Sequence, residues 1–412
     1  MKTMMGVMIL ALLVSVQAQD LQGGSGNYHA TIEKSFDVSP GGEITVREVT
    51  GDFNVKGGSN DAVKITQRIT IKSFTKGEAE EIYRRAKTAM EQSGNRIRIE
   101  GDYKGNRVHS VFDIQVPEKF DVTIKSSGGD IELAGVEGEI ELSTSGGDIE
   151  ITDSAGQTKA STSGGDLTFS SISGSVQGST SGGDIDLQDI FGEGSFSTSG
   201  GDIELKNATD RIKLSTSGGS IRVEKVSGDL QANTSGGEIW VQNIGGTCRV
   251  NTSGGDIRLQ SITGDIKANT SGGDISGADF DEPVSVNTSG GDIELDDVRA
   301  AVSANTSGGD VDVVMTLTDF SKDHGVKLGT SGGTITLTIP ENLPATIEAE
   351  IRTSRRNYDM ERYDIYSDFP LKKSKPEEFG DVIIRSEGDI NGGGDLIQLK
   401  TVGGDIHIKK GK

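Results

Sequence analysis

The sequence predicts an all-β fold, a single-chain β-solenoid (β-helix) with 18-residue coils and one short helix near its N-terminal end. Three observations predict it. Gly-Gly pairs recur at a fixed step, aliphatic and polar residues alternate after each pair, and glycine accounts for 59 of 412 residues. Average glycine usage is about 7%, so glycine is in excess. Two short strands per unit, in strict register, predict coils that stack like residues on like residues.

The repeat is defined by eleven Gly-Gly pairs that follow one another every 18 residues without an insertion. The pairs begin at Gly128, Gly146, Gly164, Gly182, Gly200, Gly218, Gly236, Gly254, Gly272, Gly290 and Gly308. Another pair begins at Gly332, after a step of 24, and a relative begins at Gly403. After each pair come an acidic column and two aliphatic columns separated by a polar one, which indicates a strand with one buried face. An antiparallel meander is the rival interpretation, but open sheets rarely exceed about ten strands.

The recurrent stretch TSGGD, as in Thr198–Asp202, is therefore predicted to be a corner of the fold. Glycine is expected to provide backbone freedom for the turn, and the aspartate is expected to accept hydrogen bonds from turn amides. Calcium binding by the aspartate column is the less favoured alternative. Calcium-binding nonapeptide rolls need a further glycine before the aspartate, which this repeat lacks. No cofactor is predicted.

Two further columns have a structural interpretation. The Asn-Thr-Ser sequences have the pattern of glycosylation acceptors, but coils about 4.8 Å apart leave no room for adjacent glycans. A ladder of side-chain amides is predicted instead. The five asparagines are Asn233, Asn251, Asn269, Asn287 and Asn305. Cys248, the single cysteine, lies in an inward aliphatic column and is predicted to be an inert buried thiol.

Four segments are expected along the chain. Residues 1–18 form a signal peptide, and residues 19–125 form irregular N-terminal coils with a capping helix at about 75–93. In that helix Thr75 and Glu78 form a capping box. The regular array spans 126–335, and irregular C-terminal coils with a cap span 336–412.

The N-terminal residues predict where the protein is located, and its net charge limits which classes of partner it can bind. Lys2, the apolar run Met8–Val16 and the small residues Val16 and Ala18 predict a cleaved secretory signal. The protein is therefore expected to be exported to the periplasm, the cell surface or the medium, with no membrane insertion after cleavage. The net charge of -22 argues against a nucleic-acid partner. A cell-surface glycan or protein is the expected partner, and the oligomeric state is left open.

One segment is singled out as a candidate ligand site. Residues 351–369 gather arginines and tyrosines in an otherwise acidic chain, and both residue types are favoured at binding hot spots. The alternative is a capping excursion, because solenoid ends need covers. The candidate residues are Arg352, Arg355, Arg356, Tyr358, Arg362, Tyr363 and Tyr366. No catalytic residue is nominated, since the four histidines are scattered and no unique constellation is present.

The chain resembles the bacterial putative-adhesin family of unknown function, which consists of exported proteins built from β-strand repeats. The resemblance rests on FDVSPGGEITVREVTGDFNVKGG, on VFDIQVPEKFDVTIKSSGGDIEL, on the TSGGDI array and on GDINGGGDLIQLKTVGGDIHIKK. It implies a β-solenoid with a role at the cell envelope or surface, and it supplies no catalytic or binding residues.

A non-enzymatic exported scaffold that binds glycans or envelope proteins is therefore the first hypothesis for function. A structural or stress-associated envelope protein without a ligand is the second. A polysaccharide-active β-helix enzyme is the third, because other enzymes use this architecture, although fold alone does not confer function.

Overall fold

The computed structural model describes most of the chain, which consists of two compact units with their boundary in the sequence between Gly183 and Asp184. The described residues are 15–18, 21–24, 26–59, 61–101, 103, 105–354, 363–375, 377–378 and 381–411. Within these ranges no helix has the length and apolar character needed to cross a bilayer.

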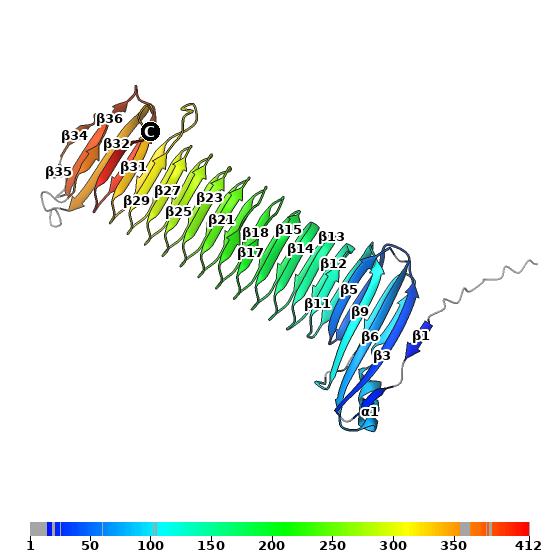
Figure 1. Ribbon diagram of the computed structural model, residues 1–412. Helices are drawn as coiled ribbons and strands as arrows, with labels where there is room; N and C mark the ends of the chain where they lie inside the picture. The colour runs from blue at the N-terminus through cyan, green and yellow to red at the C-terminus, as the bar shows by residue number, and fades with distance from the viewer. Residues whose placement is uncertain are drawn as a thin grey trace, which may run out of the picture. The chain divides into compact units, whose positions relative to one another are not determined.

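In the unit from Asp184 onward the chain coils between two parallel sheets (Figure 1). Each strand pairs in parallel with the strand one coil later, as Ile203 does with Ile221 and Ile212 with Leu230. A meander would make neighbouring strands antiparallel. The parallel register therefore confirms the β-solenoid.

The strand that follows each Gly-Gly corner belongs to the first sheet. Its strands are β15 (Ile185–Phe191), β17 (Ile203–Leu205), β19 (Ile221–Val223), β21 (Ile239–Ile244), β23 (Ile257–Ile262), β25 (Ile275–Phe280), β27 (Ile293–Val298), β29 (Val311–Met315), β31 (Ile335–Pro340), β38 (Ile406–Gly411) and β33 (Ile365–Ser367).

The strand that precedes each Gly-Gly corner belongs to the second sheet. Its strands are β16 (Gly194–Ser197), β18 (Ile212–Ser215), β20 (Leu230–Asn233), β22 (Cys248–Asn251), β24 (Ile266–Asn269), β26 (Val284–Asn287), β28 (Val302–Asn305), β30 (Val326–Gly329), β37 (Asp395–Thr401) and β32 (Ala345–Ser354).

The core lies between these sheets and consists of stacked aliphatic columns. Ile203, Leu205 and Leu214 are at most 1% exposed. Cys248 is fully buried in the same core, as predicted, and burial raises the pKa of its thiol to about 12. The thiolate is the reactive form of cysteine, so this side chain is inert in the folded protein.

The part of the N-terminal unit that leads into the second unit along the sequence also consists of coils with parallel strand pairing. Its strands there are β4 (Gly42–Val49), β5 (Asp52–Gly58), β8 (Arg96–Glu100), β10 (Phe120–Ser126), β11 (Ile131–Ala134), β12 (Glu137–Ser143), β13 (Ile149–Ser161) and β14 (Leu167–Ser179). Within this set the pairings are parallel, as between Ile131 and Ile149.

The start of that unit differs from the irregular coils expected there. The long strands β3 (Gly26–Asp37), β6 (Ala62–Ser73) and β9 (Val108–Pro117) pair antiparallel. Their inward and outward residues alternate over most of their length. Because these three strands pair antiparallel, they form a layer of their own instead of coils, whose strands pair in parallel. Shorter strands β1 (Ser15–Ala18) and β2 (Gln22–Gly24) join β3.

The helix α1 (Lys76–Ala86) is shorter than the predicted 75–93. Thr75 is the N-cap, and its hydroxyl accepts from the Glu78 amide at 3.3 Å, as the capping box predicts. Ala79 and Ile82 pack on Ile69 and Ile71 of the antiparallel layer. The helix ends because residues 89–93 form strand β7 (Ala89–Ser93), where Met90 is buried opposite Ile99.

At the C-terminal end the repeat gives way to longer antiparallel pairings. β32 pairs antiparallel with β36 (Asp381–Ile390), which also pairs with β34 (Lys372–Ser374) and β35 (Glu377–Glu378). β32 also pairs in parallel with β37, and β33 pairs in parallel with β38. The last coils therefore extend both sheets.

Candidate functional site

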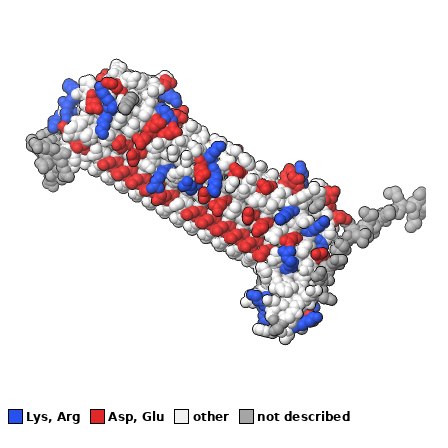
Figure 2. Space-filling model, viewed as in Figure 1, with Lys and Arg blue, Asp and Glu red and all other residues white. Residues whose placement is uncertain are grey.

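The aspartate that follows each Gly-Gly pair is bound to the next coil. Its Oδ1 accepts the backbone N–H of the residue one coil later, at 3.0 Å from Asp148 to Asp130 and 2.7 Å from Asp202 to Asp184. Ser220 does the same with its hydroxyl, which accepts from the Glu238 amide at 3.3 Å. The column thus accepts from turn amides as expected, but the amide belongs to the neighbouring coil. Figure 2 shows rows of Asp and Glu side chains on the surface.

The second glycine of each pair is required for a different reason from the one expected. A Cβ on Gly165 would lie 2.1 Å from the carbonyl oxygen of Gly147, one coil earlier. A Cβ on Gly164 would meet nothing closer than 3.8 Å. Neither glycine has a positive φ in the left-handed region. Close contact between coils, and not turn conformation, therefore excludes a side chain at the second position.

Threonine and asparagine complete the corner. The Thr162 hydroxyl donates to the Gly147 carbonyl at 2.8 Å and accepts from the Gly165 amide at 3.4 Å. The Asn251 amide donates to Asn233 Oδ1 at 2.9 Å, and Asn269 donates to Asn251 at the same distance. The predicted amide ladder is confirmed. TSGGD is thus a structural corner, and a binding surface must lie elsewhere.

The outward residues of the two sheets in the second unit differ in charge. On the first sheet they are Asp186, Glu204, Arg222, Trp240, Arg258, Ser276, Glu294, Asp312, Thr336 and His407. On the second sheet, from β16 to β37, they are Ser195, Lys213, Gln231, Arg249, Lys267, Ser285, Ser303, Lys327 and Gln398. This second set contains no carboxylate, in a chain whose net charge is -22, and it ends where Gln398 pairs with Glu348 of β32. We call this second set the cationic column.

Members of the cationic column are held in register by the sheet. Lys213 pairs with Gln231, Arg249 with Lys267 and Ser303 with Lys327 on adjacent strands. Adjacent strands lie about 4.8 Å apart. The spacing of the charges is therefore fixed by the backbone and not by flexible loops.

The cations of this column also differ from those of the first sheet in their pairing. On the first sheet Arg258 lies 2.6 Å from Glu238 and 3.3 Å from Asp256, and Arg222 lies 3.8 Å from Glu224. Within the described part of the chain, the exposed cations of the cationic column make no ion pair. These cations are Lys213, Arg249, Lys267 and Lys327. Their charge is available to a ligand.

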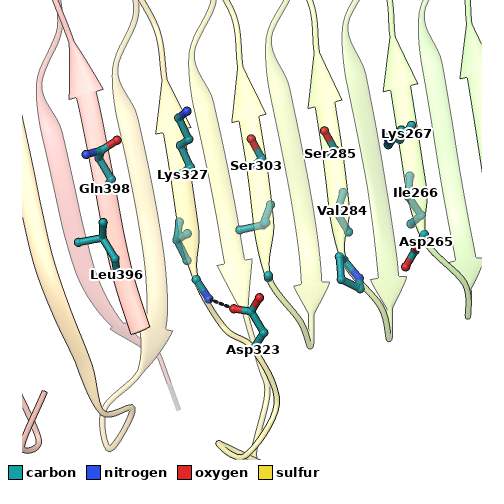
Figure 3. Close-up of a pocket in the computed structure, with 15 residues that line it drawn as sticks. Asp265, Ile266, Lys267, Val284, Ser285, Ser303, Asp323, Lys327, Leu396 and Gln398 are labelled. Carbon is teal, nitrogen blue, oxygen red and sulfur yellow. Dashed lines mark hydrogen bonds between the residues drawn. The ribbon is translucent and has the colours of Figure 1, made fainter. Parts of the chain in front are cut away.

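A groove of about 430 Å³ opens on the second sheet across β24, β26, β28, β30 and β37 (Figure 3). Small residues produce it. Ser285 and Ser303 separate the long side chains of Lys267 and Lys327, and the strand starts carry Ala301 and Gly325. Figure 3 shows Lys267, Ser285, Ser303, Lys327 and Gln398 at one level on successive strands. Small-molecule pockets measure about 300–1,000 Å³, so the volume is sufficient for a ligand.

The edge of the groove is formed where the repeat is interrupted. The 24-residue step inserts a loop before β30, and Asp323 of this loop accepts the Gly325 amide at 2.9 Å. Buried His324 anchors the loop, because its ring nitrogens lie 2.9 Å from the carbonyl oxygens of Lys322 and of Pro344. Its backbone amide donates to Asp395 at 3.0 Å. The insertion is thus fixed beside the groove.

Asp265 and Asp323 line the groove together with the exposed side chain of Leu396, which is 45% exposed. The groove therefore combines amine donors with carboxylate acceptors, serine hydroxyls and an apolar contact. A ligand with both hydroxyl groups and an anionic group would find a partner for each.

The predicted arginine–tyrosine site is only partly described. Arg355, Arg356, Tyr358 and Arg362 lie outside the described residues. The remaining candidates fall on different sheets. Arg352 is on β32, 3.6 Å from Glu350, while Tyr363 precedes β33 and Tyr366 lies on it. Tyr366 is 52% exposed and stacks on His407 at 4.9 Å between ring centroids. Binding by this segment stays a prediction.

Two features were missed from the sequence. The groove depends on which small residues become neighbours across coils, and aligning the outward column would have found them. Trp240, the single tryptophan, lies on the first sheet with the Arg222 guanidinium 3.9 Å from its ring centroid. Reading the same column, Arg222–Trp240–Arg258, would have revealed it.

Another hollow, of about 450 Å³, lies in the N-terminal unit between β4, β8 and the end of α1. Its charged residues balance, with Arg47 and Lys87 opposed by Glu48 and Glu100. It therefore offers no net charge for an ionic ligand. In the described ranges no group of three or more His, Cys, Asp or Glu side chains is arranged to hold a metal ion.

Comparison with known proteins gives a family match and two structural likenesses. The model of a family described as Toastrack DUF4097 matches residues 16–261 and 223–409. A putative adhesin from Bacteroides fragilis NCTC 9343 is 15% identical and has a TM-score of 0.33, over 53% of this chain and 96% of that chain. A putative cell adhesion protein from Clostridium sporogenes ATCC 15579 is 10% identical and has a TM-score of 0.14, over 92% and 99% of the two chains. No curated protein matches the chain.

Proposed function

We propose, from the premise that this chain belongs to the Toastrack DUF4097 family, that it is an exported, non-enzymatic scaffold that binds a glycan chain of a cell surface along its second sheet. The observation that carries the proposal is the groove bounded by Lys267 and Lys327. Its floor is formed by strands that pair in strict register, so the site is rigid before a ligand arrives. Preorganised sites lose less entropy on binding.

The lining of the groove supports binding rather than catalysis. The hydroxyls of Ser285 and Ser303 lie among lysine, glutamine, aspartate and apolar side chains, with no histidine among the residues that line the groove. A serine nucleophile needs an adjacent base. The same hydroxyls, with Gln398, are suited to hydrogen bonds with a sugar.

Export supports the glycan as the partner. The predicted signal ending at Ala18 would place the mature chain where envelope polysaccharides are present. An open groove that crosses several strands can bind a linear polymer whose chain extends past the groove at both ends.

The test is to fill the groove and measure binding. Ser303→Trp places an indole between Lys267 and Lys327, and we expect it to abolish saturable binding of the protein from Gln19 onward to envelope polysaccharide fractions. Ser276→Trp is the matched control, because Ser276 occupies an outward position on the first sheet. Circular dichroism checks that both variants fold. If both bind like the native protein, or if the native protein binds no fraction, the proposal fails.

A further inference from the structure

We infer that the ligand of the second sheet is an acidic polysaccharide whose carboxylates bind the cationic column from Lys213 to Lys327. The inference rests on the proposed function and names the class of glycan. It extends the binding surface from the groove over seven successive strands of the second sheet, from β18 to β30.

The first step of the argument is the availability of the charges. Lys213, Arg249, Lys267 and Lys327 are exposed and have no ion-pair partner among the described residues. Several other cations of this unit lie beside carboxylates, as Arg299 does beside three aspartates. A row of cations without counter-charges attracts an anion without first breaking an ion pair.

The second step is the spacing. Arg249 and Lys267 are one strand spacing apart, Lys213 and Arg249 are two apart, and Lys267 and Lys327 are three apart. With about 4.8 Å per strand, the intervals are about 5, 10 and 14 Å. Neutral Gln231, Ser285 and Ser303 occupy the positions between. This pattern fits a sugar chain whose carboxylates reach the cations and whose hydroxyls reach the neutral positions between them.

The third step separates an acidic polysaccharide from other polyanions. DNA carries one charge per about 1.7 Å, a charge density far above that of this column. Single-stranded nucleic acid is usually held by aromatic stacking, and the outward residues of this column include no aromatic side chain. Asp265 and Asp323 beside the groove can accept hydrogen bonds from the sugar hydroxyls that lie between the charged groups of the ligand.

The experiment compares two variants of equal net charge. In the first, Lys213, Arg249, Lys267 and Lys327 are each changed to Gln. In the control, Lys206, Arg222, Lys225 and Arg258, which lie outside the cationic column, are each changed to Gln. Polygalacturonate is the anionic probe, dextran is the neutral probe, and vesicles containing an anionic phospholipid are the third. Binding is measured by biolayer interferometry at low and high salt.

We expect the native protein to bind polygalacturonate and neither dextran nor the vesicles. Loss of four exposed ionic contacts predicts a loss of affinity of about fourfold to several hundredfold in the first variant. The control should retain native affinity, and added salt should weaken native binding.

Different results would overturn the inference alone or the inference together with the proposed function. Binding of dextran that Ser303→Trp abolishes but the first variant leaves unchanged would overturn the acidic class and keep the proposed function. Equal losses in both charge variants would assign the effect to net charge and overturn the inference. Binding only to vesicles would overturn it as well. If neither glycan binds and Ser303→Trp changes no envelope binding, the inference and the proposed function fall together.

Discussion

At the residue scale, the Gly-Gly pair contains two glycines with different requirements. A Cβ on the second would clash with the carbonyl of its counterpart one coil earlier, as on Gly165 at 2.1 Å, while a Cβ on the first meets nothing closer than 3.2 Å, at Gly308. The opposite corner uses a different device. Asp153, Ser171, Asn243 and Asp279 adopt φ between 48° and 69°. Asn and Asp tolerate this left-handed region better than most other residues, which explains why short polar residues recur there.

Substituting the two glycines separately tests this difference. Gly165→Ala should lower the free energy of unfolding by about 2–4 kcal/mol, because the coils must separate to admit the methyl group. Gly164→Ala is the matched control and should change it by no more than about 0.5 kcal/mol. Thermal melts followed by circular dichroism measure both. Equal destabilisation by the two substitutions would refute the close-contact explanation and favour a conformational one.

At the element scale, the insertion before β30 depends on a charged corner as well as on His324. Arg299 pairs with Asp279, Asp281 and Asp297, and Arg299 Nε lies 2.8 Å from Asp281. A hydrogen bond from Arg299 lowers the pKa of Asp279. Hydrogen bonds from Thr316, first, and from Arg299 lower the pKa of Asp297. Lys322 of the insertion donates to the Asp281 carbonyl at 3.4 Å, which links the loop to this corner.

This corner makes stability depend on pH. A carboxyl group whose pKa is lower in the folded state stabilises the fold above its unfolded pKa of about 3.9 and loses that contribution as pH falls through the folded value. Arg299→Met should therefore cost about 1 kcal/mol at pH 7, a modest value because the aspartates are nearly half exposed. Denaturant titrations should show the difference from the native protein shrinking below about pH 4.

Arg249→Met provides the control, since Arg249 is exposed and has no ion-pair partner among the described residues. This substitution should change the free energy of unfolding by little, and by the same amount at pH 7 and at pH 3. A cost for Arg299→Met that stays constant from pH 7 to pH 3 would show that packing of the side chain, and not its charge, stabilises the corner.

The elements also show how far the sequence could predict the structure. Repeat columns such as Ile203, Ile221 and Ile239 specify coil, register and core together, because each coil repeats the same burial pattern. The end of α1 was not predictable from periodicity, because Met90 continues the apolar stripe of the helix yet is buried in a strand. The groove was not predicted, because the side chains that form it lie 18 or more residues apart in the sequence. They become neighbours only when the coils stack.

At the scale of the whole molecule, the chain carries a strong excess of negative charge in a repeating arrangement. The acidic column continues through the repeat with interruptions such as Ser220, its members about 4.8 Å apart on adjacent coils, and the net charge is -22. Each Oδ1 that accepts an amide offsets part of the repulsion locally. The remaining repulsion acts between coils of the same unit and opposes their stacking.

Salt should therefore stabilise the protein. Screening shortens the range of charge repulsion from about 10 Å at 0.1 M to about 3 Å at 1 M ionic strength. We expect the melting temperature to rise by several degrees between 0.02 M and 0.5 M NaCl. Sodium sulfate would add a separate effect on hydrophobic burial, so chloride is the salt to use. A fall in melting temperature with NaCl would mean that the ion pairs contribute more than the repulsion between carboxylates.

The constant 18-residue step has a consequence for how such a protein can change over evolutionary time. Duplication or loss of 18 codons adds or removes one complete coil, whose residues find matching neighbours on both sides. Because Lys267 and Lys327 lie on the same sheet, a coil gained between them would move them apart by one strand spacing, about 4.8 Å. A lineage could thus adjust the distance between its ligand-binding charges in fixed increments, by recombination alone and without inventing a new side chain.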